Sequence, residues 1–264
     1  MTSEQDKIRT VVRDSYADIA RKSVSSSPPS SCCGAGDTEK SLEEVARQLG
    51  YSSADLEGIP FHSNLGLGCG NPQTMVSLQP GNVVVDLGSG AGFDCFIAAN
   101  RVGSGGQVIG VDMTPQMITE ARRNAREGGF RNVEFRLGEI EHLPVSNDSA
   151  DVIISNCVIN LSPDKAQVFR DAFRVLRRGG RLAISDVVAT ARLPEEIRQD
   201  RELLSGCIAG AEPIEDLCLW LQEAGFAGVE IKPWDESREF IADWAPGRKV
   251  EDLVVSASIK ATKP

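Results

Sequence analysis

The stretch VVVDLGSGAG, residues 83–92, joins a short apolar run to a loop with a glycine at every second position. The run predicts a buried strand, and the glycines let the backbone turn sharply and approach a ligand at the start of a following helix. A dinucleotide fingerprint would place its third glycine at position 93, which is Phe93. Asp112 ends the next apolar run, where a carboxylate can accept both hydroxyls of a ribose. The stretch therefore predicts a nucleoside pocket and does not favour a pyrophosphate.

Outward from this loop, strands and helices alternate along the chain. Thr114-Pro115 and Ser162-Pro163 are N-cap and N1 pairs that begin two of the helices, and Gly179 closes the second of them. The alternation predicts an α/β fold with a doubly wound, mostly parallel, Rossmann-like sheet. We expect strands over 83–88, 107–112, 133–138, 151–156 and 181–186, and helices over 93–102, 115–127 and 163–178. Later helices near 195–205 and 214–224 and strands near 228–232 and 253–261 would complete a seven-stranded sheet.

The segment before the sheet has a different character. Apolar residues at helical spacing predict an amphipathic helix over 6–21, and the Ser-, Pro- and Gly-rich stretch 23–36 predicts a linker that carries Cys32 and Cys33. Ser41 and Glu44 form a capping box for a second helix, which Gly50 ends. We expect an N-terminal region over 1–72, a nucleoside-binding core over 73–190 and a substrate-binding region with the late strands over 191–264.

Composition narrows the class of protein. The 264 residues are 41% hydrophobic with a net charge of −10, which excludes fibrous classes and disfavours nucleic acid and anionic lipid as partners. The sequence holds no apolar run of the roughly 20 residues that a membrane span needs, and its first ten residues are too polar for a secretory signal. We expect a cytoplasmic protein and, since no unexplained apolar surface stands out, a monomer.

The chain has seven cysteines, and an odd number does not fit a disulfide framework. Cys69 and Cys207 stand among glycines in loops where we expect accessible thiols, and Cys157 follows a strand at the carboxyl edge of the sheet. No CxxC pair marks a zinc site, but three thiolates that converge would select a soft ion or semimetal. Cys95 and Cys218 fit core packing.

The glycine loop and the second-strand acid resemble those of the class I S-adenosylmethionine-dependent methyltransferases, over roughly residues 75–190. The resemblance implies that Gly88 and Gly90 face the methionine moiety, that Asp112 binds the ribose, that Met113 packs on the adenine and that Asn156 lies near the transferred methyl. The stretch 138–141 would hold the adenine edge. The cofactor-binding residues implied are Asp86, Gly88, Gly90, Gly92, Asp112, Met113, Ile140, Glu141 and Asn156.

Three further motifs narrow the resemblance to the arsenite methyltransferases. LGLGCGNP at 65–72, SNCVINLSPDK at 155–165 and CIAGA at 207–211 are similar to that family's arsenic-binding motifs, in order and separation. The cysteine doublet at 32–33 is similar to the family's N-terminal pair, and Cys33 is favoured for the fourth catalytic position. The cysteine-bearing C-terminal extension of some members is missing, which leaves the redox partner arrangement open.

The resemblance implies a chemistry that needs no histidine base, and the chain has only two histidines, His62 and His142. Trivalent arsenic held by Cys69, Cys157 and Cys207 would point its lone pair at the methyl group of S-adenosylmethionine, with no metal cofactor. The substrates would be arsenite and methylated trivalent arsenicals or their thiol conjugates. Disulfide formation that involves Cys33 would reduce the product, and thioredoxin or glutathione would restore the thiols.

Three other interpretations stay open at this point. A methyltransferase for a small organic, quinone-like acceptor would explain the sheet but not the three loop cysteines. A non-enzymatic protein that binds soft metals through its thiols would leave the glycine loop and Asp112 without a purpose. A closed zinc site is the structural alternative for the same cysteines.

Overall fold

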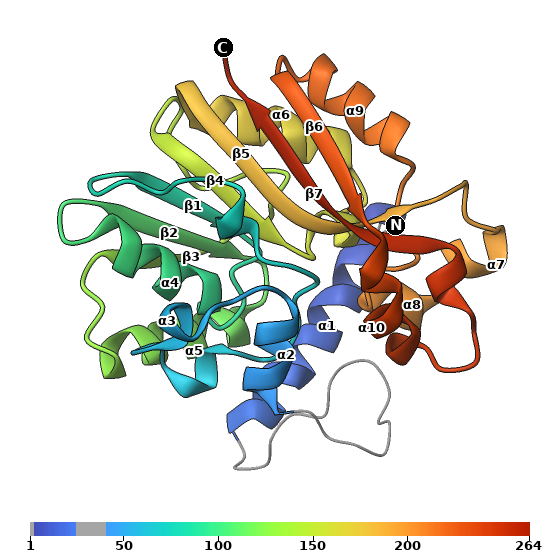
Figure 1. The fold of residues 1–264 in the computed structure, drawn as a ribbon, viewed down its shortest axis with the longest axis horizontal. Helices are drawn as coiled ribbons and strands as arrows, with labels where there is room; N and C mark the ends of the chain where they lie inside the picture. The colour runs from blue at the N-terminus through green and yellow to red at the C-terminus, as the bar shows by residue number, and fades with distance from the viewer. Residues whose placement is uncertain (1–2, 25–40) are drawn as a thin grey trace.

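The computed structural model describes residues 3–24 and 41–264, so Cys32 and Cys33 lie outside the described residues. One seven-stranded sheet, in the order β3-β2-β1-β4-β5-β7-β6, runs through the molecule (Figure 1). Its strands are β1 (Val83–Leu87), β2 (Gln107–Asp112), β3 (Val133–Leu137), β4 (Ala150–Asn156), β5 (Leu176–Ala189), β6 (Ala227–Trp234) and β7 (Val254–Thr262). The first five strands pair in parallel, and β7 lies antiparallel between β5 and β6. The predicted mostly parallel, doubly wound sheet with a late strand pair is confirmed.

Helices cover both faces of the sheet and its carboxyl edge (Figure 1). The α-helices are α1 (Glu4–Val24), α2 (Leu42–Gln48), α3 (Ser53–Leu56), α4 (Phe93–Val102), α5 (Pro115–Glu127), α6 (Lys165–Val175), α7 (Glu195–Arg198), α8 (Arg201–Ser205), α9 (Ile214–Glu223) and α10 (Arg238–Ile241). Short 3-10 turns lie between them, at Phe61–Ser63, Pro72–Thr74, Ile159–Leu161, Asp235–Ser237, Ala242–Trp244 and Val250–Asp252.

Alternate residues of the central strands build two hydrophobic cores. Val84 packs with α4 and α5 on one face, whereas Val85 and Leu87 pack with α6 and α9 on the other. All three side chains are fully buried. Burial on both faces explains why these strands are continuous apolar runs rather than alternating ones.

The predicted helix over 163–178 is wrong at both ends. Asp164, not Ser162, is the N-cap, and its side chain accepts a hydrogen bond from the amide of Gln167. At the other end, Leu176 already pairs with Ala150 of β4. Gly179 therefore lies within β5 and closes no helix. Strand pairing overrides the helical pattern there, because it depends on a partner that is distant in sequence.

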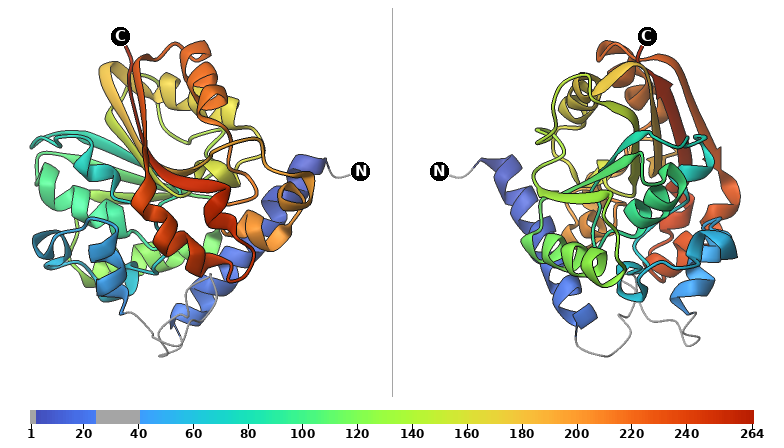
Figure 2. Two further views of the ribbon diagram at one scale, coloured as in Figure 1. Left: turned by 45° about the vertical axis from the view of Figure 1, so that its right-hand side comes forward. Right: turned by 90° about the vertical axis from the view of Figure 1, so that its left-hand side faces the viewer.

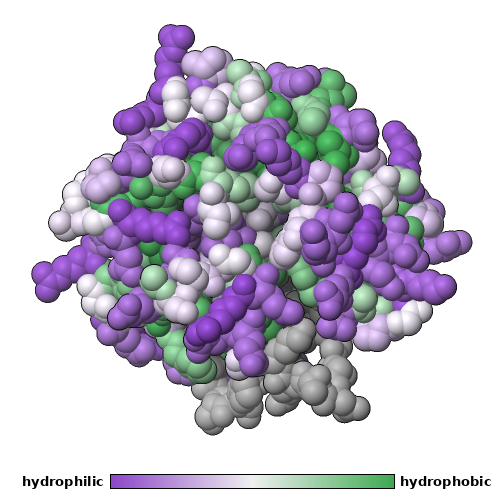
Figure 3. Space-filling model, in the orientation of Figure 1, coloured by the Kyte–Doolittle hydropathy of each residue, from purple (hydrophilic) through white to green (hydrophobic). Residues whose placement is uncertain are grey.

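Other helix signals are confirmed. Thr114 and Pro115 are the N-cap and N1 residues of α5, and the capping box of Ser41 and Glu44 begins α2. Within the residues that the structure describes, no helix has the length and apolar character needed to cross a membrane. Hydrophilic side chains cover most of the face shown in Figure 3, with smaller hydrophobic areas between them.

Candidate functional site

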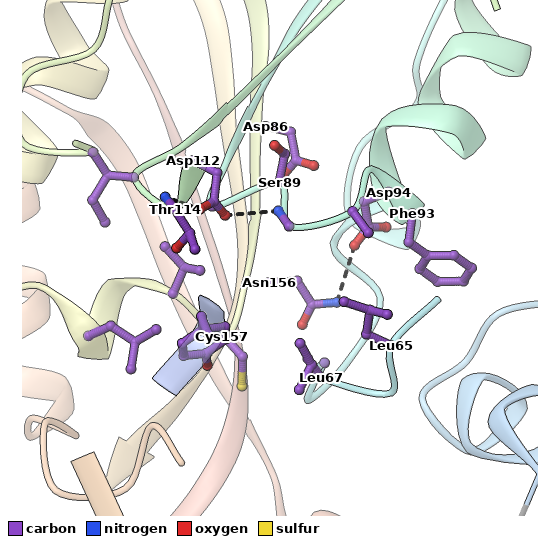
Figure 4. Close-up of a pocket in the computed structure, with 18 of the residues that line it drawn as sticks. Leu65, Leu67, Asp86, Ser89, Phe93, Asp94, Asp112, Thr114, Asn156 and Cys157 are labelled. Carbon is purple, nitrogen blue, oxygen red and sulfur yellow. Dashed lines mark hydrogen bonds between the residues drawn. The ribbon is translucent and has the colours of Figure 1, made fainter. Parts of the chain in front are cut away.

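The glycine loop and the end of β2 form the wall of a pocket at the carboxyl edge of the sheet (Figure 4). The buried carboxylate of Asp112 accepts hydrogen bonds from the amide of Gly90 at 3.0 Å and the amide of Thr114 at 2.8 Å. Burial raises the pKa of Asp112, whereas these two amides lower it. Gly88 has a φ of 68°, and a Cβ there would lie 2.1 Å from Val158. A glycine is therefore required where the loop meets the segment that follows β4.

The pocket collects the predicted cofactor residues with one exception. Gly92 does not line it but is the N-cap of α4, packed against Phe96 and Phe135. The buried hydroxyl of Ser89 lines the pocket and has no hydrogen-bond partner among the described residues. An unpaired buried hydroxyl, an acid fixed by amides and a bare glycine backbone fit a nucleoside ligand. The predicted residues that line the pocket are Asp86, Gly88, Gly90, Asp112, Met113, Ile140, Glu141 and Asn156.

Glu141 is held by neighbours at one end of the pocket. Its buried carboxylate accepts hydrogen bonds from the hydroxyl of Ser162 at 2.7 Å and the guanidinium of Arg9 at 3.1 Å. Arg9 belongs to α1, which lies beside α5 and α8 (Figures 1 and 2). Helix α1 therefore closes this end of the pocket, a role that its amphipathic pattern alone did not indicate.

Two further carboxyl groups are buried beside the glycine loop. Asp86 accepts a hydrogen bond from the Cys95 thiol at 3.1 Å, and Asp94 accepts bonds from Tyr51 and Gln73. Burial raises the pKa of Asp94, and burial together with Asp94 raises the pKa of Asp86 well above its ordinary value. Each carboxyl group therefore stays protonated to a higher pH than an exposed aspartate does, and a cationic ligand nearby would favour its ionised form.

Asn156 connects this pocket to the first cysteine motif. Its side-chain NH₂ donates to the carbonyl of Gly70 at 2.8 Å and to the hydroxyl of Tyr51 at 3.0 Å, with Asp94 at 3.3 Å (Figure 4). Its side-chain oxygen accepts the amide of Cys69 at 3.1 Å. A residue at the end of β4 therefore fixes the cysteine loop against the pocket.

The structure brings Cys69, Cys157 and Cys207 into one buried cluster, in which Cys207 donates its thiol to the carbonyl of Cys157 at 2.8 Å. Cys157 also lines the pocket. The expectation of accessible thiols in the glycine-flanked loops is wrong, because Cys69 and Cys207 expose only 0% and 3% of their surface. Burial, and after it the neighbouring thiols of Cys207 and Cys69, raises the pKa of Cys157 well above its usual value.

Asn160 and Asp186 hold the cysteine loops, and the sequence analysis missed both. Asn160 donates to Asp186 at 2.9 Å and to the carbonyl of Cys207 at 3.1 Å. Cys157 and Cys207 have φ values of 55° and 63°, which are uncommon for residues other than glycine. Asp186 ends a predicted strand at the carboxyl edge of the sheet, and that position could have marked it as a residue of the site.

The remaining cysteines and the histidines lie elsewhere. Cys95 is buried in the core, as the packing interpretation predicts, whereas Cys218 is only half-buried on α9. His62 and His142 are exposed and do not line the pocket. The site therefore offers carboxylates, an amide and thiols rather than imidazole.

Comparison with known proteins identifies the family of the chain. A family described as a methyltransferase domain matches residues 78–235. An arsenite methyltransferase of Halobacterium salinarum is 50% identical over 99% of this chain and 68% of its own length. One from Aquipseudomonas alcaligenes is 41% identical over 76% of this chain and 56% of its own length.

A crystal structure points the same way. The arsenic(III) S-adenosylmethionine methyltransferase of Chlamydomonas reinhardtii aligns with a TM-score of 0.63 at 34% identity, over 83% of this chain and 73% of that chain. The chain thus spans between about half and three quarters of these three relatives. The seven-stranded sheet is the class I methyltransferase fold, and the chain belongs to the arsenite methyltransferase family.

Proposed function

We propose that the chain transfers the methyl group of S-adenosylmethionine to trivalent arsenic held by Cys69, Cys157 and Cys207. One observation carries the proposal: Cys157 belongs both to the wall of the nucleoside pocket and to the buried thiol cluster. A methyl group at the inner end of the pocket would therefore meet arsenic on the thiols. The names of the relatives point to the same donor and acceptor.

Burial of the thiols suits the loading of arsenic. The raised pKa of Cys157 keeps its proton in place until substrate arrives. Arsenous acid then exchanges three As–O bonds for three As–S bonds, and the thiol protons leave in three water molecules. The exchange is neutral, so no unpaired charge is buried in the apolar cluster around Cys207.

S-adenosylmethionine supplies an electrophilic methyl group on a sulfonium. The chain's part is to position and to stabilise charge, because the arsenic lone pair needs no base to remove a proton. Asn156 fixes the Cys69 loop against the pocket, and the carboxyl groups of Asp86 and Asp94 favour positive charge there. We propose that the core over residues 73–190 binds the donor and that the region over residues 191–264 brings Cys207 to the acceptor.

Methyl transfer leaves arsenic pentavalent, and two thiols can return it to the trivalent state by forming one disulfide. We assign the role of exchange partner to Cys33, which lies outside the described residues, and the role of final reductant to thioredoxin or glutathione. A monomer in the reducing cytoplasm, with no metal cofactor, fits this scheme.

The decisive experiment incubates the full chain with methyl-labelled S-adenosylmethionine, arsenite and thiol, and separates the arsenic species. We expect labelled methylarsenicals, and at least about a 100-fold lower rate in Cys157→Ser, which lacks an arsenic ligand. The half-buried Cys218→Ser is the matched control and keeps the wild-type rate. Label that enters a quinone-like acceptor but not arsenic would replace this function with the organic-acceptor alternative.

A second experiment tests the redox step. Cys33→Ser should slow the first methylation of inorganic arsenite while methylation of an already methylated trivalent substrate continues, and Cys32→Ser serves as the neighbouring control. Equal losses on both substrates would make Cys33 a structural residue instead.

A further inference from the structure

A carboxylate that the proposed methyl transfer does not use lies within the thiol cluster. One oxygen of Asp186 and the sulfurs of Cys69 and Cys157 all lie within 4.8 Å of one another. The three side chains come from different parts of the chain: the loop before β1, the end of β4 and the middle of β5. All three are buried, and Asp186 exposes only 2% of its surface. The cluster thus places a carboxylate oxygen beside two thiol sulfurs.

Backbone and side-chain donors hold Asp186 in a fixed orientation. One oxygen accepts the amide of Val187 at 2.8 Å and the side chain of Asn160 at 2.9 Å, and the other accepts the amide of Ile159 at 2.8 Å. The backbone amide of Asn160 is a further donor to this carboxylate. Support of this kind is typical of carboxylates that ligate metal ions.

The ligand set favours a particular class of cation. Two thiolates with one carboxylate suit a borderline or soft divalent ion such as Zn²⁺ or Cd²⁺, whereas Mg²⁺ and Ca²⁺ prefer oxygen alone. Tetrahedral zinc needs its ligand atoms about 3.5 to 3.8 Å apart, so atoms that lie within 4.8 Å of one another need to move together by at most about 1.3 Å.

Charge balance supports the same class. Two thiolates and a carboxylate carry three negative charges, and a divalent cation neutralises two of them. Lys165, itself buried, interacts electrostatically with Glu212 and then with Asp186, and so offsets part of the third. A neutral assembly avoids the large cost of an unpaired charge in an apolar cluster.

We propose that Cys69, Cys157 and Asp186 form an alternative coordination site that takes a thiophilic divalent cation and thereby excludes trivalent arsenic. Two metal–sulfur bonds and one metal–oxygen bond form, two thiol protons pass to the buffer, and no electrons are exchanged. The exclusion of arsenic rests on the proposed function, whereas the cation site itself does not. The two occupants differ in their third ligand, because arsenic needs Cys207 and the cation needs Asp186.

The test titrates Cd²⁺ into the reduced full-length chain, with ultraviolet thiolate absorption and competition against a chelator as readouts. Asp186→Asn should weaken Cd²⁺ binding at least about 10-fold, and by a larger factor than it weakens arsenite binding. Cys207→Ser should do the opposite. The matched controls are Asp171→Asn, which replaces a buried carboxyl group on α6, and Cys218→Ser. Both variants should bind Cd²⁺ and arsenite as the wild type does. Equal loss of both ligands in Asp186→Asn, with its fold intact, would overturn the cation site.

The side chain of Asn160 and the amides of Ile159 and Val187 donate to Asp186, so replacing Asp186 can disturb the fold. A measurement on the wild-type chain avoids this problem. X-ray absorption of the Co²⁺-loaded chain should show two sulfur ligands together with oxygen. Three or more sulfur ligands without oxygen, or no Co²⁺ binding, would overturn the site. Binding of Cd²⁺ by a chain that methylates no arsenic would sink the proposed function and leave the cation site standing.

Discussion

At the scale of single residues, Asp86 and Asp94 set the electrostatics of the donor pocket. Their hydrogen-bond partners are the neutral groups of Cys95, Tyr51 and Gln73. Burial raises the pKa of both carboxyl groups, so each stays protonated to a higher pH than an exposed aspartate does. A cationic ligand favours the ionised forms. Binding of such a ligand must therefore release protons and strengthen as the pH rises through the raised pKa values.

This coupling predicts that the affinity for S-adenosylmethionine rises from pH 5 to pH 8. For every proton that binding releases, the affinity should rise by up to about 10-fold per pH unit. Calorimetry in buffers of different ionisation enthalpy measures that proton release. Asp94→Asn should reduce the slope because it removes one titrating group. S-adenosylhomocysteine, which lacks the sulfonium charge, should show a shallower slope than the donor. The same slope for both ligands would contradict the electrostatic role of Asp94.

Residues differ in how far the sequence could predict them. Asp112 and the loop glycines belong to one local motif, whose chemistry depends on neighbours along the chain. Asp94 and Asp186 act through partners that are distant in sequence, such as Tyr51 and Asn160. No local pattern encodes such contacts, so the sequence predicted the thiols but not the polar groups that position them. The burial of Cys69 was missed for the same reason, since β7 supplies the Ser256 hydroxyl that donates to its carbonyl.

At the scale of elements, α1 shows what an amphipathic pattern can and cannot predict. The apolar spacing predicted a helix over 6–21, and α1 extends over Glu4–Val24. It could not predict the surface that the helix covers, because any apolar surface satisfies the pattern. In the structure Arg9 contacts Glu141 near the donor pocket, Val12 packs in the thiol cluster, and the Tyr16 hydroxyl donates to the carbonyl of Ser205 at 3.2 Å. One helix thus contacts both halves of the site.

The position of α1 predicts slower exchange of the donor than an open pocket would allow. Arg9→Ala removes the contact to Glu141 and should raise the donor dissociation rate about 3- to 10-fold, since charged hydrogen bonds contribute about 1.5–3 kcal/mol when intact and part of that stabilisation remains. Stopped-flow fluorescence measures the rate. Arg21→Ala is the matched control on the same helix, where the guanidinium pairs with the exposed Asp18. Equal rates in the two variants would show that α1 does not close the pocket.

At the scale of the whole molecule, the two edges of the sheet have different tasks. The carboxyl ends of the parallel strands carry Asp112, Asn156 and Cys157, as the alternation of strands and helices predicted. The opposite edge carries packing and turns. Because β7 is antiparallel, its last residues lie at that opposite edge, and the sequence could not predict the direction of this strand from its apolar run alone.

Lys263 is the residue through which this division can be tested. Its ammonium donates to Asp148 at 2.7 Å and to the carbonyl of Phe173 at 2.8 Å, and it lies 4.6 Å from the centre of the Phe173 ring. Asp148 has a φ of 51° in the turn before β4, so the lysine ties a strained turn to the end of α6. Lys263→Met keeps most of the stem and should lower the free energy of unfolding by about 1–3 kcal/mol, because it removes the donor to the partly buried carbonyl of Phe173.

The same substitution should leave the donor and arsenite dissociation constants within about 2-fold, because distant sites act independently. Urea denaturation and equilibrium binding measure the two quantities. Lys260→Met on the same strand is the control, since its ammonium meets the exposed Glu230 at 3.1 Å and such pairs contribute at most about 1 kcal/mol. The contrary result is that Lys263→Met weakens donor binding by as much free energy as it takes from the fold. That result would show that the two edges are coupled through the sheet and that packing at the opposite edge affects the catalytic site.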